Sequence, residues 1–298
     1  MDREGSQIGN ISLQDSIWFS SQLEQAYQSS MRIIPFVDNI NIGNNKTYTG
    51  QVHQRLASNM VGETMRPVFQ GATIRTFTAS VSAFECPCFV PDVTLANVQF
   101  GREVLGKVGE SMGFEMGRRA DKVFLSGMNA GYDTDNTLAA NGYLDVRTIC
   151  EARGKLGAKA VRGDVICLIN YDQFTNLLMD ERFANFFYNT VRPLAQDYGE
   201  PASDFILRYQ GILFIKLADD TPLPMTLDGK RRLFMFSRDA CKFLSGTVEP
   251  YGENAPVVQF QVHRGGYDFN TRRRLGFTIT QPEGVLAIEC NDGLKPAA

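Results

Sequence analysis

The sequence predicts a mixed fold of the α+β class, and three features of the chain indicate it. The stretch 91–128 has the periodicity of one very long helix. Residues 46–84 alternate between apolar and polar side chains, as two long strands would. Beyond the long helix, short apolar runs typical of buried strands are interleaved with helical patterns. The 298 residues are enough for one large domain or two ordinary ones, with ample material for a core.

Residues 1–40 are expected to form an N-terminal arm with a single helix. A polar start leads into the run LQDSIWFSSQLEQAYQSSMR, which has one apolar side. That side carries Ile17, Trp18, Leu23 and Tyr27. Such a helix needs another element to pack on. Residues 33–37 follow as a short strand or an extended connector.

Residues 41–90 are predicted to form an extended hairpin arm. KTYTGQVHQRL alternates loosely, and ATIRTFTASVSAF alternates clearly, with Phe77, Ala79, Val81 and Ala83 on one face. Between them, residues 57–70 read as a flexible tip. A two-stranded hairpin is marginally stable alone, so we expect this one to lie on a neighbouring subunit. An internal hairpin of a sheet is the alternative.

The long helix is expected over residues 96–128, which corresponds to about 50 Å. Its apolar stripe contains Leu105, Val108, Met112, Met116, Ala120 and Val123. The opposite side carries Glu103, Lys107, Glu110, Arg118 and Asp121. A third strip consists of Gly109, Gly113 and Gly117, each costing about 1 kcal/mol against Ala in a helix interior. Close approach of another backbone would compensate, although an ordinary long amphipathic helix remains possible.

The remainder of the chain predicts an α/β region and then a return to strands. Asp145 is expected to cap a helix, and Val165–Ile169 forms a short buried strand. The run YDQFTNLLMDERFANFFY continues as a helix, and ILFIKL and RRLFMF are further strands. We expect a helix from Ser237 through Phe243. The closing strands are VVQFQVHR, RRRLGFTIT and VLAIEC.

Composition is that of a soluble globular protein. The net charge of −3 gives no general reason to expect binding to nucleic acid or to a membrane. No run approaches the roughly 18 apolar residues of a membrane span. The polar N-terminus lacks the apolar core of a signal peptide, so we expect a cytosolic protein whose six cysteines are thiols.

Two motif matches lie in the long helix, and both fail on their context. Gly101 to Lys107 resembles a phosphate-binding loop, but Val108 stands where a hydroxyl should bind Mg²⁺. Residues 109–113 spell a nucleophile elbow, a motif that needs a strained turn and a histidine base. The two histidines, His53 and His263, lie in separate strand-like segments.

Three further groups are also weak candidates. Residues 133–136 (DTDN) lack the glycine and distal glutamate of a calcium loop. Cys86 and Cys88 lack the second pair that a zinc site needs. Residues 272–274 form a short basic run, expected at a solvated strand edge or a subunit contact. The sequence therefore predicts no catalytic residue, no cofactor-binding residue and no metal ligand, and hence no enzyme and no cofactor.

The order of these parts resembles the major capsid proteins of tailed bacteriophages, which have the Hong Kong 97-type fold. The most telling stretches are CPCFVPDVTLANVQFGREVLGKVGESMGFEMGRRADKVFLSGM and VICLINYDQFTNLLMDERF. The second is similar to the family's strand and helix ending in aspartate, one residue, arginine and phenylalanine, here Asp180 to Phe183. The closing RRRLGFTITQPEGVLAIE also looks like the family's last strands.

The resemblance implies an N-terminal arm, an extended β-hairpin arm, a long spine helix, a peripheral sheet and an axial α/β domain. The peripheral domain would contain residues 91–137 and 256–282, and the axial domain residues 138–255 and 283–298. It also implies a structural protein that self-assembles into the pentamers and hexamers of an icosahedral head. The head would enclose double-stranded DNA without sequence-specific binding.

The implied partners are other copies of the chain, a portal, a separate scaffolding protein and a decoration protein, with no membrane. The implied location is the virion, assembled in the cytoplasm of a bacterial host. Some relatives cross-link their subunits through lysine and asparagine, but here the arm holds only Lys46, at its base. An encapsulin-type nanocompartment shell is the alternative in the same fold, and a soluble α/β hydrolase is the alternative from another class.

Overall fold

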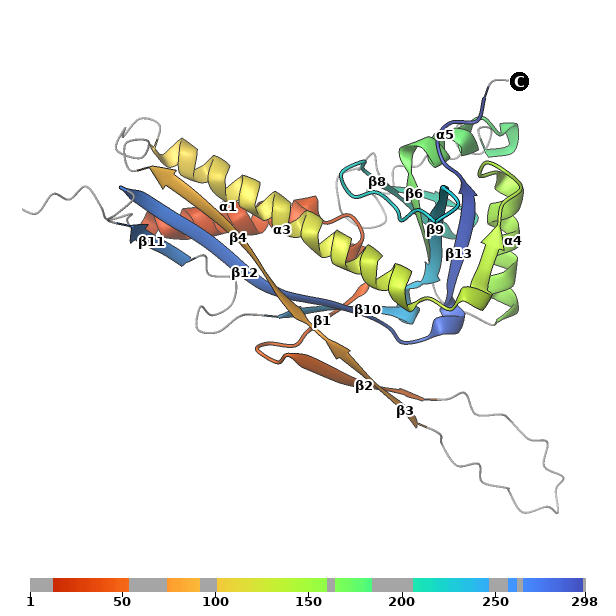
Figure 1. Cartoon of the computed structure of the whole chain (residues 1–298), viewed down its shortest axis with the longest axis horizontal. Helices are drawn as coiled ribbons and strands as arrows, with labels where there is room; N and C mark the ends of the chain where they lie inside the picture. Colours follow the sequence, from red (N-terminus) through yellow and green to blue (C-terminus); the bar gives the residue numbers. More distant parts are fainter. Residues whose placement is uncertain are drawn as a thin grey trace, which may run out of the picture.

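The computed structural model describes residues 13–53, 74–91, 101–159, 164–183, 206–246, 257–261 and 265–296. Its elements form two packed sheets, a long helical pair and a projecting two-stranded arm (Figure 1). Among the described residues, no helix combines the length and apolar character needed to cross a membrane.

The long helix is α3, Gly101–Gly131, and α1, Leu13–Ser30, packs along it (Figure 1). The strip of glycines makes this contact possible. A Cβ atom on Gly113 would lie 2.3 Å from the carbonyl oxygen of Leu23, and one on Gly117 would lie 2.8 Å from that of Tyr27. The predicted close approach is confirmed, and the approaching element is the helix of the N-terminal arm. Phe19 was not predicted on the apolar side of this helix, but it is buried with Leu23 in the contact.

The predicted apolar stripe of α3 is largely confirmed. Leu105, Met112, Met116 and Ala120 are buried, while Val108 and Val123 are half-buried. Asp121 was wrongly placed on the solvent side, because it is only 2% exposed. The chain turns directly after α1, and the carboxylate of Asp121 accepts hydrogen bonds from the backbone N–H groups of Arg32 (2.8 Å) and Ile33 (3.3 Å). These hydrogen bonds from the turn after α1 explain why a carboxyl group is buried at this position.

A five-stranded sheet lies against this helical pair. Its strands are β1 (Asp38–Asn41), β4 (Ser82–Pro91), β10 (Cys241–Gly246), β11 (Val257–Gln261) and β12 (Gly266–Ile279). The order is β1-β10-β12-β11, with β4 also paired to β12.

Two predictions for this sheet are wrong. The helix expected over Ser237–Phe243 is only a 3₁₀ turn, Arg238–Ala240, followed by β10, which belongs to this sheet rather than to the α/β region. Pairing with β12 extends the chain there and buries Phe243 completely. Residues 33–37 were expected to form a short strand or an extended connector, but they contain a 3₁₀ turn, Ile34–Phe36. The strand β1 follows them, although its sequence DNIN has little apolar alternation.

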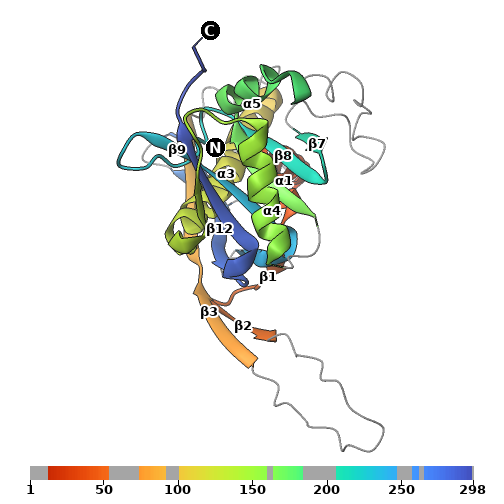
Figure 2. The ribbon, with the colours of Figure 1, turned by 90° about the vertical axis from the view of Figure 1, so that its right-hand side faces the viewer.

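The second sheet has six strands in the order β5-β13-β9-β6-β8-β7. These are β5 (Thr137–Ala139), β6 (Val165–Asn170), β7 (Ile206–Tyr209), β8 (Ile212–Leu217), β9 (Lys230–Ser237) and β13 (Val285–Asn291). Helices α4 (Val146–Ala158) and α5 (Tyr171–Leu178) pack beside it (Figure 2).

Local predictions in this region are mostly confirmed. The carboxylate of Asp145 accepts from the N–H of Thr148 at 2.8 Å and so caps α4. All six residues of β6 are buried. Helix α5 is shorter than predicted, because a turn at Met179 and Asp180 ends it. Between β7 and β8, Gln210 and Gly211 both have positive φ (48° and 73°), as tight hairpin turns require.

One core joins the two sheets around the C-terminal half of α3. The ring of Phe124 lies 5.6 Å from that of Phe236 in the six-stranded sheet. It lies 4.6 Å from that of Phe277 in the five-stranded sheet. The two sheets therefore share one hydrophobic core.

The arm consists of β2 (Thr47–His53) and β3 (Ile74–Ser80), which pair antiparallel and project away from the body (Figures 1 and 2). The predicted tip, residues 57–70, lies outside the described residues. Phe77, Ala79 and Val81 share the more buried face as predicted, but Ala83 is exposed. The alternation of buried and exposed side chains shifts by one residue where β3 passes into β4. From there on, the chain pairs with β12.

Candidate functional site

The described residues contain no group of three or more His, Cys, Asp or Glu side chains that could hold a metal ion. The phosphate-loop and nucleophile-elbow matches both lie inside α3. Their backbone N–H groups belong to a continuous helix and cannot form the loop or the strained turn that either motif needs. His53 ends β2, whereas His263 lies outside the described residues.

The remaining candidate groups have structural roles. The carboxylate of Asp133 accepts from the N–H of Asp135 and so begins a 3₁₀ turn. Cys86 and Cys88 are half-buried on β4, and burial raises the pKa of both thiols, which lowers their thiolate fraction at neutral pH.

The basic run 272–274 was expected at a solvated strand edge or a subunit contact, and the strand-edge alternative is wrong. It lies in β12, which pairs with β4 along this run and with β10 at Arg274. Arg272 pairs with Glu85 across the sheet at 2.9 Å. Arg273 is only 7% exposed, and its guanidinium pairs with Glu24 of α1.

The first candidate interaction surface is the arm. A small cluster of Ile42, Ala79 and Leu244 fixes its base, with Tyr48 and Val81 packed against it. The N–H of Val81 also donates to the carbonyl of Lys46 at 3.1 Å. Farther along, the rings of Tyr48 and Phe77 pack in a tilted arrangement, with their centres 5.9 Å apart. The arm is thus packed against the body at one end and projects as a two-stranded ribbon.

The opposite face of the described arm is polar. Thr47, Thr49, Gln51, Thr76, Thr78 and Ser80 are exposed on it. A ribbon with one apolar and one polar face is suited to lie on another surface, because only one of its faces has to remain in water.

The second candidate surface is a short hairpin within the connection from β8 to β9, in which Met225 pairs antiparallel with Arg231. The side chain of Leu227 at its tip is fully exposed, and Met225 is 51% exposed. The hairpin is closed by the N–H of Thr226, which donates to the carbonyl of Lys230 at 2.8 Å. The sequence predicted a turn near here, but exposure of a leucine has no local sequence signal.

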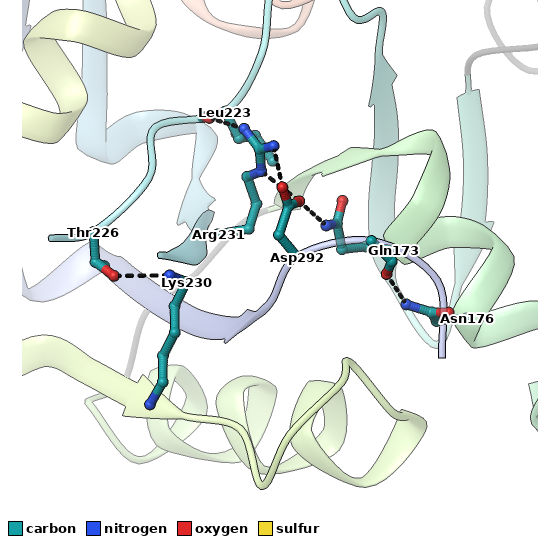
Figure 3. Close-up of polar contacts among 8 residues, drawn as sticks. Gln173, Asn176, Leu223, Thr226, Lys230, Arg231 and Asp292 are labelled. Carbon is teal, nitrogen blue, oxygen red and sulfur yellow. Dashed lines mark hydrogen bonds and ion pairs between the residues drawn. The ribbon is translucent and has the colours of Figure 1, made fainter. Parts of the chain in front are cut away.

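A polar network holds this hairpin on the body (Figure 3). The guanidinium of Arg231 donates to both carboxylate oxygens of Asp292, at 2.9 and 2.7 Å, and to the carbonyl of Leu223 at 2.8 Å. Gln173 of α5 donates to the same carboxylate at 3.3 Å. The hydrogen bond from Arg231 is the largest reason why the pKa of Asp292 is lowered. The exposed apolar tip is therefore presented from a fixed base.

The C-terminal segment adds to this surface. Asn176 of α5 donates to the carbonyl of Gly293 at 2.9 Å and accepts from the N–H of Lys295 at 2.8 Å. Between these two bonds Leu294 is 53% exposed, and Met179, just after α5, is 58% exposed. The end of the molecule that contains the six-stranded sheet thus presents several apolar side chains to solvent.

The family described as phage capsid protein matches residues 105–292, more than half of the chain. The chain belongs to this family. A comparison with curated proteins finds no match. As a phage capsid protein, the chain is a structural shell component, and its family and fold point away from an enzyme.

Solved structures confirm the predicted Hong Kong 97-type fold of this capsid protein. The capsid of Ralstonia phage GP4 is 11% identical, with a TM-score of 0.69 over 88% of this chain and 88% of that one. The head structure of Helicobacter pylori bacteriophage KHP40 is 14% identical, with a TM-score of 0.63 over 86% and 87%. The holo-SrpI encapsulin complex from Synechococcus elongatus PCC 7942 is 10% identical, with a TM-score of 0.58 over 88% of each chain.

Proposed function

We propose that this capsid protein assembles into the pentamers and hexamers of an icosahedral phage head that encloses double-stranded DNA. The observation that carries the proposal is the projecting arm, a ribbon anchored at its base and with no described element of its own subunit beneath its outer part. Because an isolated two-stranded ribbon is marginally stable in water, a neighbouring copy is the natural surface for it to lie on.

In this proposal, each of the two sheets belongs to a different part of the subunit. The peripheral part comprises α3 as spine with the five-stranded sheet, to which β1 and β10 contribute. The axial part comprises the six-stranded sheet with α4 and α5. Its exposed Leu227 and Met225 would meet equivalent parts of neighbouring copies around an axis. The shared core near Phe124 would keep the two parts in a fixed relation during assembly.

The proposed partners are other copies of the chain, a portal, a separate scaffolding protein and a decoration protein. Packaged DNA would be enclosed without sequence-specific contacts, which is consistent with the small negative net charge of −3. The protein would have no catalytic role. It would assemble in the cytoplasm of a bacterial host and remain in the virion.

A nanocompartment shell is the second candidate, and the fold it shares with the Synechococcus encapsulin favours it. Particles purified from the producing cells and treated with nuclease distinguish the two functions. A phage head should retain protected double-stranded DNA. Particles that contain one enzyme and no protected DNA would contradict the phage function and support the compartment.

A further inference from the structure

A hollow of about 220 Å³ lies between α1 and the five-stranded sheet. Its polar lining includes Glu24 and Tyr27 of α1, Asn39 and Asn41 of β1, and Arg273 and Arg274 of β12. We call it the α1 hollow. It belongs neither to the arm nor to the hairpin with the exposed leucine.

Charge in the α1 hollow is unbalanced. Its lining contains two guanidinium groups, Arg273 and Arg274, and one carboxylate, Glu24, which leaves a net charge of +1. Arg273 is only 7% exposed, and its guanidinium carbon lies 3.7 Å from the centre of the Tyr27 ring. Its Nε has no hydrogen-bond partner among the described residues. A buried arginine of this kind is stabilised by additional negative charge.

Three side-chain acceptors in the lining are already engaged. The side-chain oxygen of Asn39 accepts from Ser245 at 2.9 Å, and that of Asn41 accepts from the N–H of Gly43 at 2.9 Å. Glu24 accepts from Gln28 at 3.1 Å as well as from Arg273. The amide nitrogens of Asn39 and Asn41 donate to no described residue. Arg274 uses one of its N–H groups to donate to the backbone carbonyl of Asn44. Its other N–H groups and the two amides leave the α1 hollow with spare donors beside its positive charge.

We propose that the α1 hollow binds a small oxyanion of the phosphate class. Guanidinium groups match the geometry of phosphate and carboxylate oxygens, and charge-assisted hydrogen bonds are about twice as strong as neutral ones. A bound oxyanion would accept hydrogen bonds from Arg274 and the amides of β1. It would join these strands to the arginine that already holds α1, and thus fasten the N-terminal arm to the body.

Calorimetric titration of the purified full-length chain with inorganic phosphate tests this proposal, together with thermal unfolding in phosphate and in sodium chloride of equal ionic strength. Phosphate should raise the melting temperature beyond the effect of chloride, because a ligand that binds only the folded state stabilises it. Arg274→Gln should weaken phosphate binding at least tenfold. The test replaces Arg274 rather than Arg273, because the loss of Arg273 would leave Glu24 without its arginine partner.

Arg272→Gln is the matched control. It removes the same charge from the neighbouring position, but Arg272 pairs with Glu85 and does not line the α1 hollow. This variant should bind phosphate as the unmodified chain does. The proposal is overturned if phosphate acts no differently from chloride, if Arg274→Gln binds it unchanged, or if both variants lose it equally.

Discussion

At the scale of single residues, the contact between α1 and α3 depends on glycine. A methyl group at position 113 would lie 2.3 Å from the carbonyl oxygen of Leu23 and 2.9 Å from the backbone nitrogen of Tyr27. Backbone atoms cannot move aside as flexible side chains can. We expect Gly113→Ala to lower the free energy of unfolding by about 1–3 kcal/mol, and Gly113→Leu to yield unassembled or insoluble protein. Urea denaturation measures the first effect.

Gly154 provides the control for this prediction. It lies on an exposed side of α4, and a Cβ atom there would meet nothing within 4 Å. Gly154→Ala should therefore raise the free energy of unfolding by about 0.4–1 kcal/mol through helix propensity alone. Equal effects at the two positions would show that the glycine strip is not a packing feature.

Asp121 gives the protein a predictable pH dependence. Burial raises its pKa from 3.8 to about 7, against the opposing effect of hydrogen bonds from the backbone of Arg32 and Ile33. Between those two pH values the folded state keeps a proton that the unfolded state has lost. The free energy of unfolding should therefore fall as the pH rises towards 7, and this contribution should be flat above it.

Asp121→Asn isolates this effect, because the amide keeps an oxygen acceptor and does not titrate. Relative to the variant, the unmodified chain should lose a few kcal/mol between pH 4 and 7, at about 1.4 kcal/mol per pKa unit. Urea denaturation at several pH values measures the difference. Parallel pH profiles for the two proteins would mean that Asp121 does not titrate in this range.

At the scale of elements, the arm should serve assembly rather than folding. Its tip, residues 57–70, contains five large apolar side chains, Met60, Val61, Met65, Val68 and Phe69. Burying each on a neighbour would contribute about 1.5–3 kcal/mol as an upper estimate. Replacing residues 58–69 with a Gly/Ser loop should leave near-native circular dichroism and melting, yet prevent closed particles, which electron microscopy detects.

Thr78→Ser, on the exposed polar face of the same arm, is the control and should assemble normally. If the loop variant assembles as the unmodified chain does, the tip makes no essential contact with a neighbour. If it fails to fold, the tip packs within its own subunit.

Elements with strong local signals could be predicted from the sequence. Asp145 marks the start of α4, and the period of α3 indicates its buried stripe. The strand β10 could not be predicted, because only pairing with β12 decides that CKFLSG is extended. The end of α5 at Leu178 was missed for a similar reason, since the helical pattern continues past the turn.

At the scale of the whole molecule, the order of an arm, a hairpin, a long helix and an α/β region was enough to predict the fold. The surfaces proposed for assembly were only partly predictable. The alternation of residues 74–80 predicts the hairpin arm. The exposure of Leu227, by contrast, depends on the ion pair between Arg231 and Asp292, two residues that are far apart in the sequence. The α1 hollow likewise combines side chains from four separate elements.

The central claim is that this capsid protein closes into a shell. Sedimentation velocity of the purified full-length chain, with electron microscopy of the same sample, tests it most directly. The account predicts large, closed particles of uniform size at neutral pH and moderate salt. A single species that sediments as a monomer or dimer under those conditions, at every concentration examined, would contradict it.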